Sequence, residues 1–113
     1  MDKLTTPTKK VYPQIYIFED KHAPGWLKVG YTEKQNAEDR VREQFNTRLQ
    51  SDKSPYILHH VEDAVDIDGK VFRDFDVHKV LTNKGIIKRG EFFKTDIERA
   101  KLAIMSVKEK KDL

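Results

Sequence analysis

The chain has 113 residues, of which 37% are hydrophobic and 36% are charged, so we expect one compact domain with a modest core and a highly charged surface. It has no cysteine, which excludes disulfides and thiolate metal sites, and no apolar run approaches the roughly 18–20 residues that a membrane span needs. The formal net charge of +3 is compatible with a polyanionic partner, and the first residues lack the apolar core of a signal peptide, so a cytoplasmic soluble protein is the default expectation.

The domain itself is expected to begin with a β-hairpin. Residues 1–11 are polar and predict a loose N-terminal arm in front of a domain that covers 12–108. Two apolar runs at 14–19 and 26–31 flank a polar turn, which is the pattern of a hairpin. Because strand side chains alternate, one face of this hairpin collects aliphatic side chains: Ile15, Ile17, Leu27 and Val29.

The other face of the hairpin raises the question of a site. We predict Phe18 across from Trp26 and Tyr16 across from Lys28, with Gly30 next along the second strand. A nearby ammonium favours the phenolate, so Lys28 is expected to lower the pKa of Tyr16, beside an aromatic pair that closes one end of a shallow pocket. Glycine weakens a strand unless another group approaches the backbone. The alternative is an ordinary exposed Tyr–Lys cross-strand pair.

The segment after the hairpin predicts a helix that begins at the N-cap Asn36. Its apolar stripe recurs every four residues: Ala37, Val41, Phe45 and Leu49. A turn at 50–54 leads to a predicted third strand over 55–62. In that strand, His59 and His60 are expected to face opposite ways, which makes them structural residues rather than ligands of one metal ion.

The C-terminal half predicts two further helices. One covers about 69–83, ends near Gly85, and has an apolar stripe made of Val71, Phe75, His78 and Leu81. Residues 86–93 suit a short strand or an extended segment. Thr95 and Glu98 predict a capping box that opens the last helix, whose stripe is Ile97, Ala100, Ile104 and Val107.

The expected order of elements, β-β-α-β-α-(β)-α, predicts an α+β fold in which a small antiparallel sheet of about three strands is flanked by three helices. The polar tail at 109–113 has no signal that stops a helix. We therefore expect the tail to lead into a further domain of a longer protein.

Motifs along this order resemble the GIY-YIG nuclease superfamily. Q-I-Y at 14–16 and K-V-G at 28–30 resemble its two-part signature, and R-V-R-E at 40–43 resembles the helix motif of one branch. V-H at 77–78 and G-E-F-F at 90–93 resemble the helix histidine and the late G-E-[WF]-F block of that branch. Each motif alone is weak, whereas the ordered set is fairly specific.

The resemblance runs from about 13 to 107, and three features depart from the family pattern. Gln14 stands where the signature has its first glycine, and Lys28 stands where it has its second tyrosine. An asparagine that some members carry near the end has no match in this chain.

The resemblance implies hydrolysis of DNA phosphodiester bonds with one divalent ion, Mg²⁺ or Mn²⁺. It implies Tyr16 as the general base, Arg40 as the guanidinium that stabilises the transition state, and Glu91 as the metal ligand. Lys28 is expected to contact the phosphate, and His78 to position the water or bind the leaving side. For His78, which falls on an apolar stripe, the alternative is a hydrogen-bonded core histidine.

Contacts with the DNA backbone are expected from scattered cations rather than from one block: Lys9, Lys10, Lys28, Arg40, Arg42, Lys88 and Arg89. Such contacts are salt-sensitive and do not read sequence. Arg42 is also the alternative to Arg40 as the catalytic guanidinium, because both flank Val41 on the predicted helix.

Three functions are therefore compared. The first is a metal-dependent endonuclease domain, associated with a restriction or helicase partner. The second is a catalytically inactive nucleic-acid-binding or interaction module on the same fold. The third is a basic structural domain, for which no convergence of Tyr16, Lys28, Arg40 and Glu91 is expected.

Overall fold

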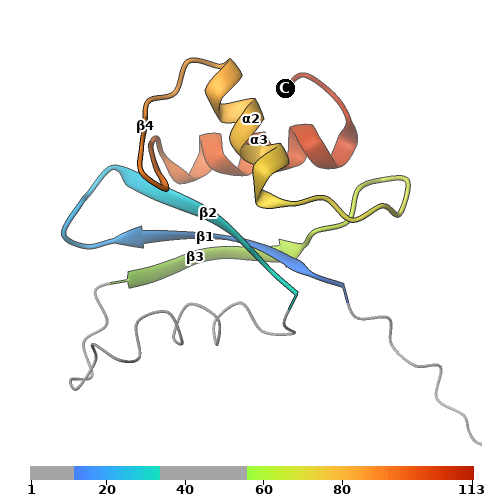
Figure 1. Ribbon diagram of the computed structural model, residues 1–113, viewed down its shortest axis with the longest axis horizontal. Helices are drawn as coiled ribbons and strands as arrows, with labels where there is room; N and C mark the ends of the chain where they lie inside the picture. The colour runs from blue at the N-terminus through green and yellow to red at the C-terminus, as the bar shows by residue number, and fades with distance from the viewer. Residues whose placement is uncertain (1–11, 34–55) are drawn as a thin grey trace, which may run out of the picture.

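A computed structural model describes residues 12–33 and 56–113 of the chain (Figure 1). These residues form an α+β fold, as predicted, with a five-stranded antiparallel sheet in the order β3-β1-β2-β5-β4. The elements are β1 (Gln14–Asp20), β2 (Trp26–Thr32), β3 (Tyr56–Asp63), α2 (Asp74–Asn83), β4 (Lys88–Arg89), β5 (Phe92–Lys94) and α3 (Ile97–Glu109). The N-terminal arm and the helix predicted after Asn36 lie outside the described residues.

Both described helices cover the same face of the sheet, which we call the helix face (Figure 1). The aliphatic side of the hairpin points into this layer, as predicted, and α2 and α3 supply the opposing side chains. Residues buried there include Ile15, Ile17, Leu27, Val29, Val77, Leu81, Phe93, Ala100, Ala103 and Ile104. Their burial is the main favourable term that holds the helices to the sheet.

The opposite face of the sheet carries a second buried cluster, and we call it the Tyr16 face. Tyr16 and Phe18 are each 1% exposed, and partly buried side chains of β3 and β5 pack against them: Tyr56, Leu58, Val61 and Phe92. The hairpin therefore separates its two sets of side chains as its alternating pattern indicates.

The predicted pairing of the hairpin is wrong by two residues. Phe18 pairs with Lys28, and Tyr16 pairs with Gly30. The physical reason lies in the connection, which closes through two successive tight turns: Ala23 N–H donates to Asp20 O, and Trp26 N–H donates to Ala23 O. A shift of two residues keeps every side chain on its predicted face, whereas a shift of one would have exchanged the faces.

A β-bulge also alters β3 against β1, because the register shifts at His59. The strict alternation predicted for the two neighbouring histidines therefore does not hold. Each imidazole instead lies near its own carboxylate, since His59 Nε2 is 2.7 Å from Glu19 Oε1 and His60 Nε2 is 2.6 Å from Glu62 Oε2.

The second predicted helix begins five residues later than expected, at Asp74. The residues before it form a tight turn in which Asp66 Oδ1 accepts hydrogen bonds from the backbone N–H groups of Asp68 and Lys70. The helix then opens at Arg73, whose N–H donates to Asp76 Oδ2 at 2.9 Å.

This later start moves the apolar stripe of α2. Val71 and Phe75, which were predicted to be core residues, are 49% and 56% exposed, while Val77 and Leu81 are fully buried. The predicted end is confirmed, because Gly85 follows the helix with a φ of 79°, a left-handed conformation that glycine adopts readily.

The C-terminal segment adds more sheet than predicted. Residues 86–93, expected as one short strand or extended segment, form β4 and begin β5, with Gly90 at a φ of 61° between them. These two short strands raise the strand count from the predicted three to five among the described residues.

The stripe of α3 is confirmed, because Ala100 and Ile104 are fully buried and Ile97 and Val107 pack against the core. The predicted cap is displaced by one residue. Asp96, and not Thr95, is the N-cap, and its Oδ1 accepts from Arg99 N–H at 2.8 Å. No helix in the described ranges is long and apolar enough to cross a bilayer.

Candidate functional site

Two of the predicted site residues, Lys28 and Glu91, meet on the Tyr16 face. Lys28 extends from the middle of β2, and Glu91 lies in the turn between β4 and β5. The pairing of Leu27 with Phe93 brings that turn beside β2. The Lys28 Nζ atom is then 3.4 Å from Glu91 Oε1, with the lysine side chain 13% exposed and the carboxylate side chain 76% exposed.

Aromatic rings form the floor beneath this ion pair. The rings of Tyr16 and Phe18 stack with centroids 5.9 Å apart, and the Phe18 ring contacts Phe92 edge to face at 6.1 Å. Lys28 Nζ lies 5.4 Å from the centroid of Phe18, within the distance of a cation–π contact. The ammonium is therefore held between an aromatic face and a carboxylate, which fixes its position on the sheet.

Gly30 has a specific reason to be glycine. A Cβ atom at this position would lie 2.3 Å from Cζ and 2.4 Å from the hydroxyl oxygen of Tyr16. The phenol ring therefore lies directly across the glycine of the neighbouring strand. The expectation that another group approaches the backbone here is met, and the group is Tyr16 itself.

His78 does not reach this face. It lies on α2, where its Nε2 is 2.8 Å from the carbonyl oxygen of Val29 and its ring is 5.1 Å from that of Phe93. Val29 and Phe93 both belong to the core on the helix face. Of the two alternatives for His78, this position fits the hydrogen-bonded structural residue, because the sheet separates it from Lys28 and Glu91.

Tyr31, the tyrosine of β2, packs against the core of the helix face. Burial and then the nearby Glu33 raise its pKa, against the opposing effect of Arg73. The Arg73 guanidinium lies 4.5 Å from the centre of its ring. A raised pKa makes a phenol a poorer proton acceptor. Tyr31 is therefore not a substitute for the second tyrosine of the family signature, whose position Lys28 occupies.

The two cations of β4 point to opposite sides of the sheet. Arg89 pairs with Phe92, and its guanidinium lies 5.4 Å from the ring centre of Trp26 on the Tyr16 face. Lys88 instead lies 5.7 Å from the ring of Phe93, a core residue of the helix face. The predicted DNA-binding residues are therefore divided between the faces, and Lys9, Lys10, Arg40 and Arg42 lie outside the described residues.

A hollow lies beside the ion pair, on the face where the sequence predicted a shallow pocket closed at one end by Phe18 and Trp26, and Trp26 lines it. It has a volume of about 280 Å³ and is lined by Asp20, Ala23, Trp26, Arg89 and Phe92. Trp26 and Lys28 lie two residues apart on one strand, so that strand alternation alone places them on one face. The same parity places Lys94, the partner of Trp26, on this face as well.

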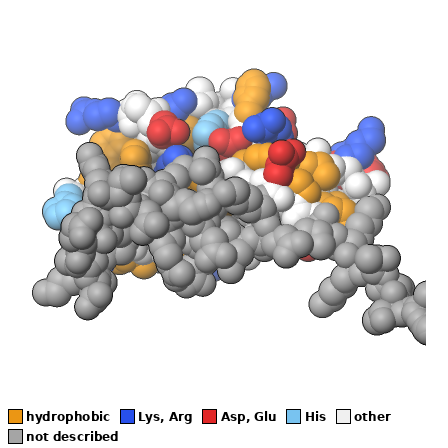
Figure 2. All heavy atoms as spheres, turned by 60° about the horizontal axis from the view of Figure 1, so that its bottom comes forward, with side chains coloured by type: hydrophobic (Ala, Val, Ile, Leu, Met, Phe, Trp, Pro, Cys, Tyr) orange, Lys and Arg blue, Asp and Glu red, His pale blue; other side chains and the backbone are white. Residues whose placement is uncertain are grey.

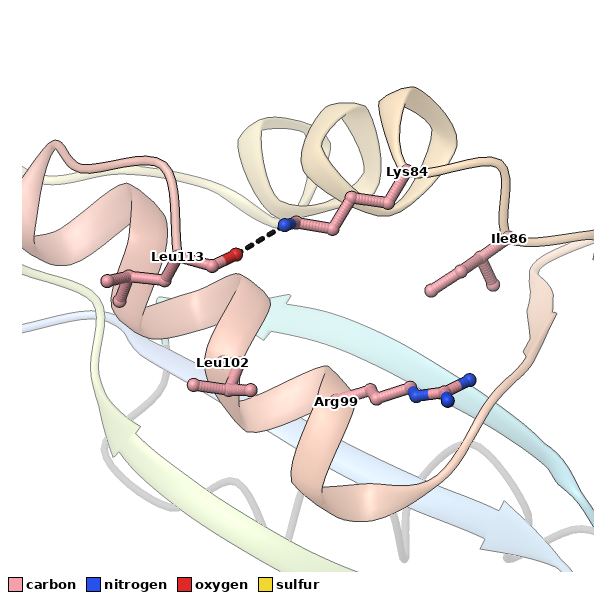
Figure 3. A pocket seen from close by; sticks show the side chains of 5 residues that line it. All are labelled: Lys84, Ile86, Arg99, Leu102 and Leu113. Carbon is pink, nitrogen blue, oxygen red and sulfur yellow. Dashed lines mark hydrogen bonds between the residues drawn. The ribbon is translucent and has the colours of Figure 1, made fainter.

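Another hollow lies on the helix face, between the end of α2 and α3 (Figure 3). Lys84 Nζ donates a hydrogen bond there to the backbone oxygen of Leu113. The described residues that line it are two cations and three apolar side chains: Lys84, Arg99, Ile86, Leu102 and Leu113. Because none of these side chains is a carboxylate or a phenol, this hollow is less suited to hydrolysis than the Tyr16 face.

Charged side chains of both signs are mixed over the surface that Figure 2 displays. Blue and red groups alternate there above the grey residues and do not gather in one basic block. On the part of the surface that this view shows, the charge is therefore mixed rather than of one sign.

The donor set at Glu91 suits a magnesium-type ion only in part. Among residues 12–33 and 56–113, no group of three or more histidine or acidic side chains is arranged to hold a metal. Mg²⁺ is commonly bound by one or two carboxylates together with substrate phosphates and waters. One exposed carboxylate therefore fits such an ion when a phosphate supplies further oxygen ligands.

No family can be assigned to the chain by comparison with known proteins. Comparisons with protein-family models, with curated proteins and with solved structures find no match to the chain. The candidate function therefore rests on the residues of the Tyr16 face.

Proposed function

We propose that the Tyr16 face is the active site of a metal-dependent endonuclease domain of the GIY-YIG type, which hydrolyses DNA phosphodiester bonds. One observation carries the proposal: the contact of 3.4 Å between Lys28 and Glu91 on the face that also holds Tyr16. The motif resemblance selected these three residues from distant parts of the chain. A basic structural domain gives no reason for them to share a face.

The roles follow from the chemistry of each group. The oxygen of a water molecule forms a bond to phosphorus while the bond from phosphorus to the leaving oxygen breaks. Tyr16, as the phenolate, accepts the proton of that water at its phenolic oxygen, and the leaving oxygen takes a proton from solvent. Lys28 donates hydrogen bonds to a non-bridging phosphoryl oxygen. An ion held by Glu91 supplies further positive charge to those oxygens when bound. The guanidinium of Arg40 is proposed to stabilise the negative charge that develops on the same phosphoryl oxygens.

Glu91 has two tasks in this scheme. Before DNA binds, its carboxylate is near the Lys28 ammonium, which neutralises part of the charge on both groups. When a phosphate arrives, Lys28 has a second anion to contact, and a carboxylate oxygen becomes available to the ion. Metal binding and DNA binding are therefore expected to reinforce each other.

His78 enters the proposal as a positioning residue. Its hydrogen bond to the carbonyl of Val29 ties α2 to the strand that carries Lys28. We assign it no contact with phosphate or water.

A second candidate is the catalytically inactive binding module on the same fold, and the burial of Tyr16 favours it. The side chain is 1% exposed, whereas a general base must reach the attacking water. The lysine, the arginine and the aromatic rings of this face remain suited to binding a nucleic-acid backbone in either case.

A plasmid-cleavage assay separates the two candidates. The chain is incubated with supercoiled plasmid and Mg²⁺ or Mn²⁺, next to the variants Glu91→Gln and Glu98→Gln. Glu98 is an exposed glutamate in the first turn of α3 and serves as the matched control. We expect nicked or linear product with the unchanged chain and with Glu98→Gln, and a rate at least about 100-fold lower with Glu91→Gln.

Cleavage that persists undiminished in Glu91→Gln contradicts the metal ligand. Binding of plasmid without cleavage by any of the three proteins favours the inactive module. Chelation with EDTA must abolish the product, because a cleavage that survives it does not depend on the proposed ion.

A further inference from the structure

We propose that the hollow next to the ion pair is a stacking site for one unpaired nucleobase, so that the substrate is single-stranded DNA or DNA with an unpaired nucleotide beside the cleaved bond. This inference rests on the proposed function for the position of the phosphate, although its test is a binding measurement. The hollow is lined by Asp20, Ala23, Trp26, Arg89 and Phe92.

The size and lining of the hollow suit a small flat group. Its volume of about 280 Å³ is just below the range of roughly 300–1,000 Å³ that is typical of pockets for drug-sized ligands. Trp26 and Phe92 supply aromatic surface, and the Asp20 carboxylate can accept a hydrogen bond from an exocyclic amino group of a base. The Oδ1 atom of Asp20 already accepts a hydrogen bond from the backbone N–H of His22 at 2.8 Å, and a carboxylate has lone pairs left for a further donor.

Arg89 shows that the tryptophan ring is open to a planar partner. Its guanidinium lies 5.4 Å from the ring centre of Trp26, and its side chain is exposed at the end of a two-residue strand. A base that stacks on Trp26 takes the place of the guanidinium. The displaced guanidinium then stacks on the outer face of the base or contacts its phosphate.

The hollow is joined to the proposed phosphate site by shared side chains. Phe92 lines the hollow and also contacts Phe18, whose ring underlies Lys28. Trp26 and Lys28 are two residues apart on β2, which corresponds to about 7 Å along a strand. A nucleotide whose phosphate contacts Lys28 can therefore direct its base toward Trp26.

A paired base cannot use this site. In a duplex, each base is covered on both faces by its neighbours, so the ring face that Trp26 needs is exposed only after unstacking. Single strands offer this face without that cost. A preference for unpaired DNA is therefore the property that distinguishes a stacking site from a plain cationic surface, which would favour the more highly charged duplex.

The single tryptophan of the chain makes the test direct, because Trp26 is its only indole fluorophore. The full chain with Glu91→Gln, which prevents cleavage, is titrated with a 12-nucleotide single strand and with a blunt hairpin duplex. We expect saturable quenching of the tryptophan emission by the single strand and at least about fivefold weaker binding of the duplex.

Three further variants, measured with a labelled oligonucleotide, separate stacking from charge. Arg89→Ala and Lys88→Ala remove one positive charge from neighbouring residues on opposite faces. We expect Arg89→Ala to weaken single-strand binding about fivefold or more, and Lys88→Ala to weaken it less than about twofold. Arg89→Lys keeps the charge without the planar group and should not restore the affinity. Trp26→Leu should abolish the preference for the single strand.

Several results overturn the stacking site. These are equal losses in Arg89→Ala and Lys88→Ala, equal affinity for both forms of DNA, and no quenching up to about 1 mM oligonucleotide, which is tenfold above the weakest usual non-specific dissociation constants. Failure of the nuclease proposal looks different, because plasmid cleavage is then absent while quenching and the single-strand preference remain. Cleavage without either binding effect rejects the stacking site alone.

Discussion

Of the five glycines, Gly30 is the one at which an added Cβ atom would meet another group within 4 Å. A Cβ there would lie 2.3 Å from Cζ of Tyr16, whose ring is 1% exposed and cannot move into solvent without losing its packing. Overpacking of this kind costs about 1–3 kcal/mol. We therefore expect Gly30→Ala to lower the free energy of unfolding by that amount in a urea titration.

The same substitution in a Tyr16→Ala background identifies the cause. Without the ring, the added methyl group no longer meets the three atoms nearest to it, which all belong to Tyr16, and alanine is better than glycine within a strand. The cost of Gly30→Ala should then vanish or become a gain. An equal loss in both backgrounds would show that something other than the Tyr16 ring restricts this position.

Residue by residue, the sequence predicts faces better than partners. Ile15, Ile17 and Val29 were assigned to the core from alternation alone, and all three are fully buried. The cross-strand partner of Tyr16 was predicted wrongly because the register depends on the two turns that close the hairpin. The residue types in such turns indicate their geometry only weakly. The contact of Lys28 with Glu91 needed, in addition, the position of β5, which only long-range pairing decides.

At the level of elements, the Glu62 side chain of β3 links this strand to α3 through a hydrogen bond from Lys108. Its Oε1 accepts a hydrogen bond from Lys108 Nζ at 2.7 Å, and its Oε2 lies 2.6 Å from His60 Nε2. Burial raises the pKa of Glu62, but the hydrogen bonds from Lys108 and His60 outweigh burial and leave this pKa below its ordinary value of 4.5.

This shift has a definite sign for stability. A lowered pKa in the folded state means that the ionised carboxylate stabilises the fold above about pH 4.5, and that this contribution is lost as the pH falls through the folded pKa. We expect Glu62→Gln to lower the free energy of unfolding at pH 7 by on the order of 1 kcal/mol. Urea titrations should show that the difference from the unchanged chain shrinks toward low pH.

Asp63→Asn provides the control, because Asp63 is the next residue of β3 and is exposed. This substitution should leave the loss of unfolding free energy at low pH the same as in the unchanged chain. A Glu62→Gln variant with an undiminished acid-dependent loss would place the titrating group elsewhere.

The two described helices show where element prediction works and where it does not. The stripe of α3 follows directly from residues spaced by three and four, and its burial is as predicted. In α2 the same rule wrongly assigned Val71 to the helix. The Asp66 side chain closes a turn before the helix, so the helix begins only at Asp74. A side chain that competes for backbone N–H groups is difficult to recognise from periodicity.

For the whole molecule, the order of elements was enough to predict an α+β fold with an antiparallel sheet. The extent of that sheet was not predicted, because β4 and β5 have only two and three residues and show no alternation of their own. Their placement at the edge of β2 is what brings Glu91 and Arg89 to the Tyr16 face. The site thus depends on the part of the fold that has the weakest signal in the sequence.

The distribution of charge over the faces leads to a prediction for the whole molecule. The described cations of the Tyr16 face are Lys28, Arg89 and Lys94. If all three contact single-strand phosphates, the logarithm of affinity should fall with the logarithm of salt concentration with a slope of about −2. Binding should then weaken about 20-fold between 50 and 200 mM salt, as measured by fluorescence anisotropy of a labelled oligonucleotide.

Two lysines on opposite sides of the molecule show which face the DNA uses. Lys94→Ala should reduce the steepness of the slope by about 0.7, because one phosphate contact is lost. Lys79→Ala, on α2 of the helix face, should leave the slope unchanged. The converse result, a slope that responds to Lys79 and ignores Lys94, would place the nucleic acid on the helices and separate it from Lys28 and Glu91. Because both variants remove the same charge, net charge alone predicts equal effects, and only a bound backbone on one face makes them differ.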